Sequence, residues 1–275
     1  MRSPVLVLTL LSIAACNTEV DAERADQAVH EATLTYDGGN YTTPAAKLAH
    51  GQRLSRALGC NGCHGSNFQG GEFPPQPGWG SIHSANLTQL AAYSDDQFER
   101  TIRTGVRRDG RELWLMPSHV YQHLSKTDMA ALISFFRSLP PQGEVHPSPV
   151  FGEGAKAEIA SGGMKPPSKL VPDYKARTPA DLGKKQAFGR YIAMTVCSGC
   201  HGAELEGMEG FAPDLVIAGA YTLPEFEVLL TTGKPNGPRK LELMAESAQK
   251  HFASMTVAER AALWGYLKAR SDRPM

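Results

Sequence analysis

Cys60-Asn61-Gly62-Cys63-His64 and Cys197-Ser198-Gly199-Cys200-His201 are two copies of one five-residue pattern in this chain of 275 residues. In each copy two cysteines are separated by two residues, and a histidine follows the second cysteine directly. This spacing is typical of covalent c-type haem attachment, in which the thiols form thioethers with the porphyrin vinyl groups and the histidine ligates the iron. The pair of motifs therefore predicts two covalently bound haem c groups.

Two other interpretations of the motif are a Cys-x-x-Cys redox pair and half of a zinc site. Neither makes specific use of the histidine that follows. A zinc site would also draw its four ligands from both copies, whereas each copy here stands inside its own complete sequence repeat. Haem attachment accounts for every residue of the pattern.

The composition limits the remaining chemistry. The chain has five cysteines, of which four belong to the motifs, so no pair is left for a structural disulfide. The formal net charge is zero, with 28 basic and 28 acidic residues, and it gives no indication of a nucleic-acid partner. The fifth cysteine, Cys16, needs a separate explanation.

Cys16 lies at the end of a typical export signal. Arg2 precedes an apolar run from Val5 to Leu11, and Ile13-Ala14-Ala15-Cys16 matches the lipobox of bacterial lipoproteins. The run is much shorter than the roughly 20 residues of a membrane span. We expect a signal peptide over residues 1–15, a lipid on Cys16, and a location on the periplasmic side of a bacterial membrane.

The rest of the chain divides into four segments. Residues 16–43 are expected to form an acidic tether, because residues 17–43 contain six acidic residues and a single arginine. Residues 44–141 and 183–270 each contain one motif and are expected to form two tandem helical domains. Residues 142–182, rich in proline and glycine, would connect them. Strand signals are nearly absent, so the predicted fold class is all-α.

Helix signals recur in the two halves. A helix is predicted between Ser94 and Gly105, and another between Thr222 and Gly233. Ser125 and Thr256 each begin a further helix. The apolar positions expected to face the two cores are Leu48, Gly51, Leu54, Leu58, Phe98, Ile102, Met129, Leu132, Ile133, Phe136, Leu139, Phe226, Leu229, Leu230, Leu263, Trp264 and Leu267. The loop over residues 70–80 is expected to lack regular structure and to wrap a haem edge.

The sixth ligand of each iron is predicted from the repeat. Met116 lies 11 residues after Gly105, and Met244 lies 11 residues after Gly233, so the two methionines occupy equivalent places in expected loops. A methionine sulfur is a common partner of histidine on the iron of electron-transfer haems. Met129 and Met255 fit core packing better. Three histidines remain competing candidates for bis-histidine ligation: His119, His123 and His251.

With these residues in place, the chain resembles the class I diheme cytochromes c, in particular the cytochrome subunits that accept electrons from membrane-bound dehydrogenases. In the first half the residues that carry the resemblance are the motif, Ala85-Asn86-Leu87-Thr88, Asp95 to Gly105, Asp109-Gly110, Met116-Pro117 and Leu124-Ser125 to Pro141. In the second half they are Tyr191 to Gly202, which includes the motif, Pro213-Asp214-Leu215, Thr232-Gly233 and Met244. Those subunits often carry three haems, whereas this chain has two motifs, and Met244 lacks a following proline. In the family a proline carbonyl accepts a hydrogen bond from the proximal histidine. Pro213 fits that place, and the first half offers no equally clear match.

The resemblance and the motifs together favour an electron carrier that is not itself an enzyme. It would transfer electrons between redox partner proteins, from a dehydrogenase or membrane donor to a downstream acceptor. The main alternative is a diheme enzyme, such as a peroxidase or a sulfur-compound dehydrogenase, with one open or labile iron site. A third possibility is a docking subunit whose haems connect a larger complex.

Overall fold

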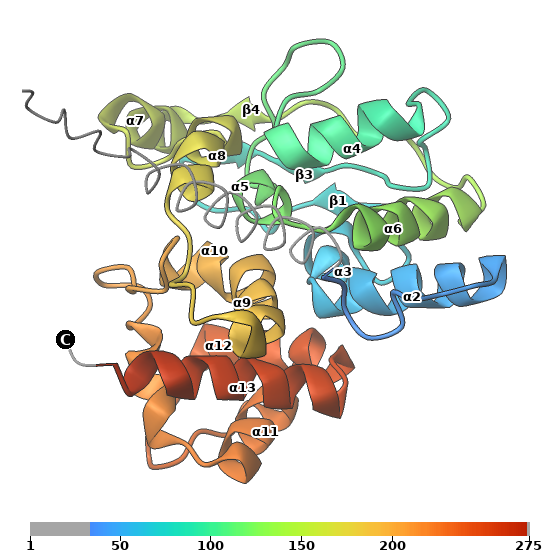
Figure 1. The fold of residues 1–275 in the computed structure, drawn as a ribbon. Helices are drawn as coiled ribbons and strands as arrows, with labels where there is room; N and C mark the ends of the chain where they lie inside the picture. Colours follow the sequence, from blue (N-terminus) through green and yellow to red (C-terminus); the bar gives the residue numbers. More distant parts are fainter. Residues whose placement is uncertain (1–33, 274–275) are drawn as a thin grey trace, which may run out of the picture. The chain divides into compact units, whose positions relative to one another are not determined.

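The computed structural model describes residues 34–273, which are helical over most of their length (Figure 1). The predicted signal peptide, Cys16 and the first part of the tether lie outside the described residues. The elements of the first half are α2 (Pro44–Ala57), α3 (Cys60–His64), β1 (Gly71–Glu72), β2 (Gly80–Ser81), β3 (His83–Ser84), α4 (Asp95–Thr104), α5 (Ser118–Tyr121) and α6 (Lys126–Ser138).

The remaining elements belong to the connection and the second half. They are β4 (Val150–Phe151), α7 (Glu153–Ser161), α8 (Pro167–Ala176), η1 (Lys184–Gln186), α9 (Ala187–Ile192), the π-helix η2 (Ala193–Cys197), α10 (Ser198–His201), η3 (Leu215–Ala220), α11 (Leu223–Thr232), α12 (Glu242–Lys250), η4 (Phe252–Ser254) and α13 (Val257–Ser271). No helix between residues 34 and 273 is both long and apolar enough to cross a membrane.

The predicted helix ends are confirmed at several places. Ser94 forms a capping box at the start of α4, and Thr256 forms one at the start of α13. α11 begins after Thr222. Gly105 and Gly233 end α4 and α11 in the left-handed conformation, with φ of 73° and 75°, which a glycine adopts without steric cost. The helical core of each half thus follows from local sequence signals.

One helix crossing organises each half. α2 packs on α6 in the first half, and α9 packs on α13 in the second. A Cβ atom placed on Gly51 would lie 2.0 Å from the Ala131 carbonyl oxygen, and one placed on Gly189 would lie 2.1 Å from the Ala262 carbonyl oxygen. Both crossings therefore depend on a glycine, because no side chain fits between the two backbones.

Short strand pairs occur where none is expected. β1 pairs antiparallel with β3, and β2 pairs antiparallel with β4. Each of these strands is two residues long, too short to produce an alternating sequence pattern. The expectation of an irregular loop over residues 70–80 is wrong at its ends, since Gly71 and Gly80 both pair. The Phe151 ring of β4 also packs on Trp114 at 4.9 Å, so the connection is anchored to the first half.

The connection contains two helices that the sequence pattern does not reveal. Prolines and glycines mask any periodicity in residues 142–182, yet α7 and α8 form there. Pro167 is the first residue of α8, where its missing amide hydrogen costs nothing. α8 contacts α4 and α5 of the first half, and the Tyr174 hydroxyl donates to the Ser198 carbonyl of the second half at 3.3 Å.

The end of the expected tether is folded. Residues 35–37, here called the strap, belong to the same compact unit as the rest of the described chain. The Tyr36 side chain is fully buried, and its hydroxyl is hydrogen-bonded to the Thr195 hydroxyl at 2.7 Å. Asp37, counted among the acidic residues of the tether, accepts a hydrogen bond from the Thr256 hydroxyl. The expectation of a solvated segment up to residue 43 is therefore wrong for the strap.

Two buried carboxylates join the halves. Asp128 and Glu259 are the third residues of α6 and α13, and neither is exposed to solvent. Asp128 accepts from the Tyr191 hydroxyl of the second half at 2.7 Å, and Glu259 accepts from both terminal nitrogens of Arg53 of the first half at 2.8 Å. The two adjacent amides of the strap donate to the same carboxylates, at 3.1 and 3.0 Å.

Candidate haem-attachment sites

The first motif forms a single helical turn. α3 lies between Gly59 and Gly65, which have φ of 77° and 76° and separate the turn from α2 and from the following loop. Cys60 is partly buried, Cys63 is exposed, and both are free thiols. Burial raises the pKa of the Cys60 thiol to about 12, whereas a cysteine used in thiol redox chemistry has a lowered pKa. The pair therefore lacks the thiolate character of a redox motif.

The histidine of this turn is held in one orientation. His64 is buried, and its Nδ1 donates to the Ala85 carbonyl at 2.7 Å. Burial lowers the pKa of His64, and the hydrogen bond to Ala85 partly opposes this effect. The ring is thus neutral near pH 7, with its proton on Nδ1 and the Nε2 lone pair available to a metal. Ala85 supplies the acceptor for which the sequence offered no clear match in the first half.

The second motif repeats this geometry. α10 continues directly from the π-helix η2 and ends at Gly202, which has φ of 84°. The His201 Nδ1 donates to the Pro213 carbonyl at 2.7 Å, so the contact predicted for Pro213 is confirmed. Burial raises the pKa of the Cys197 thiol to about 12, while Cys200 is exposed. Both motifs present two thiols and one oriented imidazole from a single turn.

The loops after the two histidines also correspond. The Gly70 amide donates to the His64 carbonyl at 2.8 Å, and the Gly207 amide donates to the His201 carbonyl at 2.7 Å. The fourth residue after each histidine, Phe68 or Leu205, has a positive φ, of 59° and 67°. A left-handed conformation is uncommon for such residues and persists only where the surroundings hold it. The same unusual conformation at the same offset shows that the two turns are built alike.

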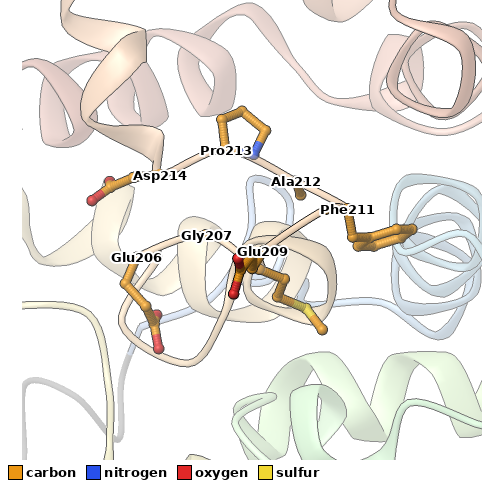
Figure 2. A pocket seen from close by; sticks show the side chains of 9 residues that line it. Glu206, Gly207, Glu209, Phe211, Ala212, Pro213 and Asp214 are labelled. Carbon is orange, nitrogen blue, oxygen red and sulfur yellow. The ribbon is translucent and has the colours of Figure 1, made fainter. Parts of the chain in front are cut away.

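The loop that contains Pro213 lines a hollow. Residues 206–214 surround it, and the Phe211 side chain extends from the loop (Figure 2). Phe211 and Met208 are 58% and 43% exposed, so both leave apolar surface free near the hydrogen bond between His201 and Pro213. Exposed apolar side chains gathered at one place often mark a ligand surface. The hollow therefore offers apolar contacts next to the second motif.

The donor set of each turn fits haem c. Two protonated, unpaired thiols and an imidazole with a free Nε2 are the groups that thioether attachment and axial ligation require. By contrast, no group of three or more His, Cys, Asp or Glu side chains in the described part of the chain is arranged to hold a metal ion directly.

The two methionines differ in their surroundings. Met116 lies in a loop, as expected, after Leu115 with φ of 65° and before Pro117. Met244 lies in the first turn of α12, so its expected loop setting is wrong. No proline follows Met244, and the next residues include good helix formers such as Ala245 and Glu246, so the helix begins before the methionine. Both methionines are partly buried.

The three histidines considered as alternative iron ligands make other contacts. Cε1 and Nε2 of the His251 ring would lie 3.0 Å from a Cβ atom on Gly62, so His251 packs against the first motif although it belongs to the second half. The His123 Nε2 donates to the Tyr174 carbonyl at 3.0 Å, and the His119 ring packs edge-on against the Tyr174 ring at 4.5 Å. Burial lowers the pKa of His119 and of His123 to about 4, which keeps both neutral.

Comparison with known sequences places the first motif in a family. Residues 48–140 match the cytochrome c family. The chain is 36% identical over 101 residues to the gluconate 2-dehydrogenase cytochrome c subunit of Pantoea cypripedii, a match that covers 33% of this chain and 23% of that protein. It is 32% identical over 97 residues to the cytochrome c subunit of the quinone alcohol dehydrogenase of Gluconacetobacter polyoxogenes, covering 33% and 20%.

A third relative is the fructose dehydrogenase cytochrome subunit of Gluconobacter japonicus, 29% identical over 107 residues, or 34% of this chain and 22% of that protein. The chain thus spans less than a quarter of the length of these three relatives. Each of them is named as the cytochrome subunit of its dehydrogenase. The chain therefore contains a cytochrome c domain, matched over residues 48–140, with homology to the cytochrome c subunits of dehydrogenases.

Proposed function

We propose that the protein is an exported, lipid-anchored diheme c-type cytochrome that transfers electrons between a dehydrogenase or membrane donor and a downstream acceptor. The observation that carries this proposal is the pair of equivalent turns, each with two free thiols and one histidine whose Nδ1 is fixed by a backbone carbonyl. Bound haem would supply one-electron transfer at its iron.

The proposal assigns a role to each residue of the two turns. Cys60 and Cys63 would hold one haem, and Cys197 and Cys200 the other, through thioethers. Ala85 and Pro213 orient the proximal rings of His64 and His201 and keep the proton on Nδ1, which directs Nε2 toward the iron. Met116 and Met244 are the proposed sixth ligands.

We extend the class I assignment to both halves, as tandem cytochrome c domains over residues 44–141 and 183–270. Three shared features support this step: the glycine helix crossing, the capped helix ending in a left-handed glycine, and the loop after the histidine. The lipid on Cys16 and the periplasmic location remain proposals that rest on the lipobox. The redox partners are proposed from the names of the relatives.

One observation favours the alternative of a diheme enzyme. Met244 lies in α12 rather than in a loop, and a methionine within a helix has less freedom to approach an iron. A second site without a firm sixth ligand would be open or labile and could bind a small substrate. The test of the proposal must therefore examine the two sites separately.

The experiment compares Met116→Ala and Met244→Ala with the wild type. We expect six-coordinate, low-spin haems in the wild type that do not bind carbon monoxide when reduced. Each variant should turn one haem high-spin and let it bind carbon monoxide, with unchanged covalent haem content. Met129→Ala and Met255→Ala are the controls, since both side chains are almost fully buried. They should lose about 2–5 kcal/mol of stability and keep the wild-type spectrum.

Two results would contradict this assignment. Carbon monoxide binding by one haem of the reduced wild type would support the enzyme alternative. Two low-spin haems in Met244→Ala would mean that another residue ligates the second iron.

A further inference from the structure

The short helix α5 reaches the first motif. It follows Met116-Pro117 directly, and its last residue, Tyr121, is buried. The Tyr121 hydroxyl donates to the Leu58 carbonyl at 2.6 Å. Leu58 ends α2 two residues before Cys60. The phenol therefore lies against the backbone that leads into the first haem-attachment turn.

The same helix also reaches the second motif. α5 contacts both η2 and α10, the two elements that contain Cys197–His201. A Cβ atom placed on Gly199, in the middle of that motif, would lie only 3.2 Å from Val120 Cγ2. Val120 is itself almost fully buried. The packing of α5 on the second motif thus leaves little room for a side chain at position 199.

The surroundings of the Tyr121 hydroxyl agree with this position. Burial raises the pKa of Tyr121 well above its usual range, and its nearby ionisable groups are Cys60, Cys63 and Cys200. These three cysteines come from both motifs. The hydroxyl therefore stays protonated at any physiological pH, and its neighbours are the attachment points of both proposed haems.

The second half makes a reciprocal contact. His251, which follows α12, packs its ring against Gly59, just before the first motif, and against Gly62 within it, at 3.5 and 3.0 Å from their Cβ positions. In each half, then, the segment after the proposed methionine ligand backs the motif of the other half. Each motif is thus in contact with a side chain from the opposite half, Val120 for the second motif and His251 for the first.

We propose that α5 is a partition shared by the two haem sites and that electrons pass from one site to the other through it, with Tyr121 in the path. This inference rests on the proposed function. In each transfer one electron leaves the reduced iron of one site and reduces the oxidised iron of the other, and no proton moves. Tyr121 is neither oxidised nor deprotonated, and its ring and hydrogen bond to Leu58 provide close-packed contact where a gap would slow the transfer.

The test uses the full-length protein in a Met116→Ala background, where carbon monoxide binds the first site of the half-reduced form. A laser flash releases the carbon monoxide, and the electron then redistributes to the second site, which is followed by absorbance. Adding Tyr121→Phe removes the hydrogen bond and should slow this redistribution several-fold. Adding Tyr121→Leu removes the ring and should slow it tenfold or more. The midpoint potentials and covalent haem content should match those of the background variant.

Tyr174→Phe is the matched control, because the Tyr174 hydroxyl donates to the Ser198 carbonyl of the second motif alone. It should leave the redistribution rate unchanged. Equal rates of electron redistribution in the Tyr121→Phe, Tyr121→Leu and Tyr174→Phe proteins would overturn the inference. If both haems are present in these proteins, the proposed function is not affected by that result. Absence of a second haem, or of carbon monoxide binding in the background, would instead overturn the proposed function. Tyr121→Phe retains the ring, so it keeps the test decisive if Tyr121→Leu fails to fold.

Discussion

At the scale of single residues, Asp128 links separate parts of the described chain. Its carboxylate is fully buried and accepts hydrogen bonds from five groups. These are the Thr35 hydroxyl, the Tyr36 amide, the His50 Nε2, the Ser125 hydroxyl and the Tyr191 hydroxyl. The donors come from the strap, from α2 and the N-cap of α6 in the first half, and from the second half. One side chain thus connects three parts of the fold.

We expect Asp128→Asn to destabilise the protein by about 3–5 kcal/mol, because the donors lose a buried anionic partner. Urea unfolding at pH 7 measures the loss. Asp95→Asn is the control, since Asp95 pairs with Arg137 at the surface, is 67% exposed and should contribute no more than about 1 kcal/mol. Equal losses in the two variants would contradict the prediction.

The Asp128 carboxylate should also make the stability of the protein fall at acid pH. Burial alone would raise the pKa of Asp128, but the hydrogen bonds from His50, Thr35, Tyr191 and Tyr36 outweigh it, and the net pKa is lowered. The stabilisation is therefore complete above the unfolded-state pKa, near 4, and is lost as pH falls through the lower folded-state value. Thermal unfolding of Asp128→Asn should accordingly show a weaker fall between pH 5 and pH 3 than that of the wild type.

The sequence predicts only part of these residue roles. Ser125 and Thr256 are recognisable as cap residues, so the positions of Asp128 and Glu259 in the first helical turns follow from local pattern. Their partners in the other half do not, because hydrogen bonds across 63 and 206 residues leave no periodic trace. The motif cysteines and histidines are predicted because their chemistry depends on local spacing. Ala85 is missed because a backbone carbonyl has no residue-type signal.

At the scale of elements, the two glycine crossings are the most sensitive contacts. Gly51→Ala would place a methyl group against the backbone of α6, and Gly189→Ala would place one against α13. Each should cost about 1–3 kcal/mol or more, because neither backbone can move away without disturbing its helix. Urea unfolding and the haem spectrum of each variant provide the measurement.

Gly265→Ala is the matched control within α13. The nearest atom to its Cβ position is the Gln186 side-chain oxygen at 3.8 Å, an ordinary contact. Alanine there should stabilise the protein by about 0.4–1 kcal/mol, since it restricts the unfolded chain and favours the helix. If all three substitutions change stability in the same direction and by the same amount, the crossings are not the tight contacts described.

Element prediction from the sequence succeeds where a cap and a periodic apolar face coincide. α4, α11 and α13 have both signals, and their bounds are close to those expected. It fails for α8, because its prolines are typical of a loop. It also fails for α12, because the mostly polar residues around Met244 give no clear helical pattern. In both cases packing against neighbouring elements, α5 for α8 and α11 for α12, supports a helix that its own sequence barely indicates.

At the scale of the whole molecule, the repeat in the sequence predicts two similar halves but not their contacts. Each motif is backed by a side chain from the opposite half, Val120 for the second and His251 for the first. Such complementarity depends on the shapes of two surfaces, which composition and spacing do not encode. The two motifs are therefore connected by side-chain contacts that are visible only in the folded chain.

The proposed lipid anchor gives the whole-molecule prediction. Cys16→Ala should remove the acyl chains, each of which contributes about 0.8 kcal/mol per buried CH₂ group, and release the protein from membranes. The described fold begins well after this residue, so the soluble variant should keep both haems and the wild-type spectrum. Fractionation of cells followed by haem staining provides the measurement. Protein that stays with washed membranes would show that another contact holds it there.

The strap also determines when the fold can be completed. Asp37 is among the first of the described residues to be synthesised. The carboxylate that accepts the hydrogen bond from its amide belongs to Glu259, 222 residues later in the chain. The Arg53 guanidinium donates to the same carboxylate. The Glu259 part of the join between the halves therefore forms only after α13 has been synthesised. A chain terminated before residue 257 would keep the contact between Asp128 and Tyr191 but would leave the Asp37 amide and the Arg53 guanidinium without their shared acceptor.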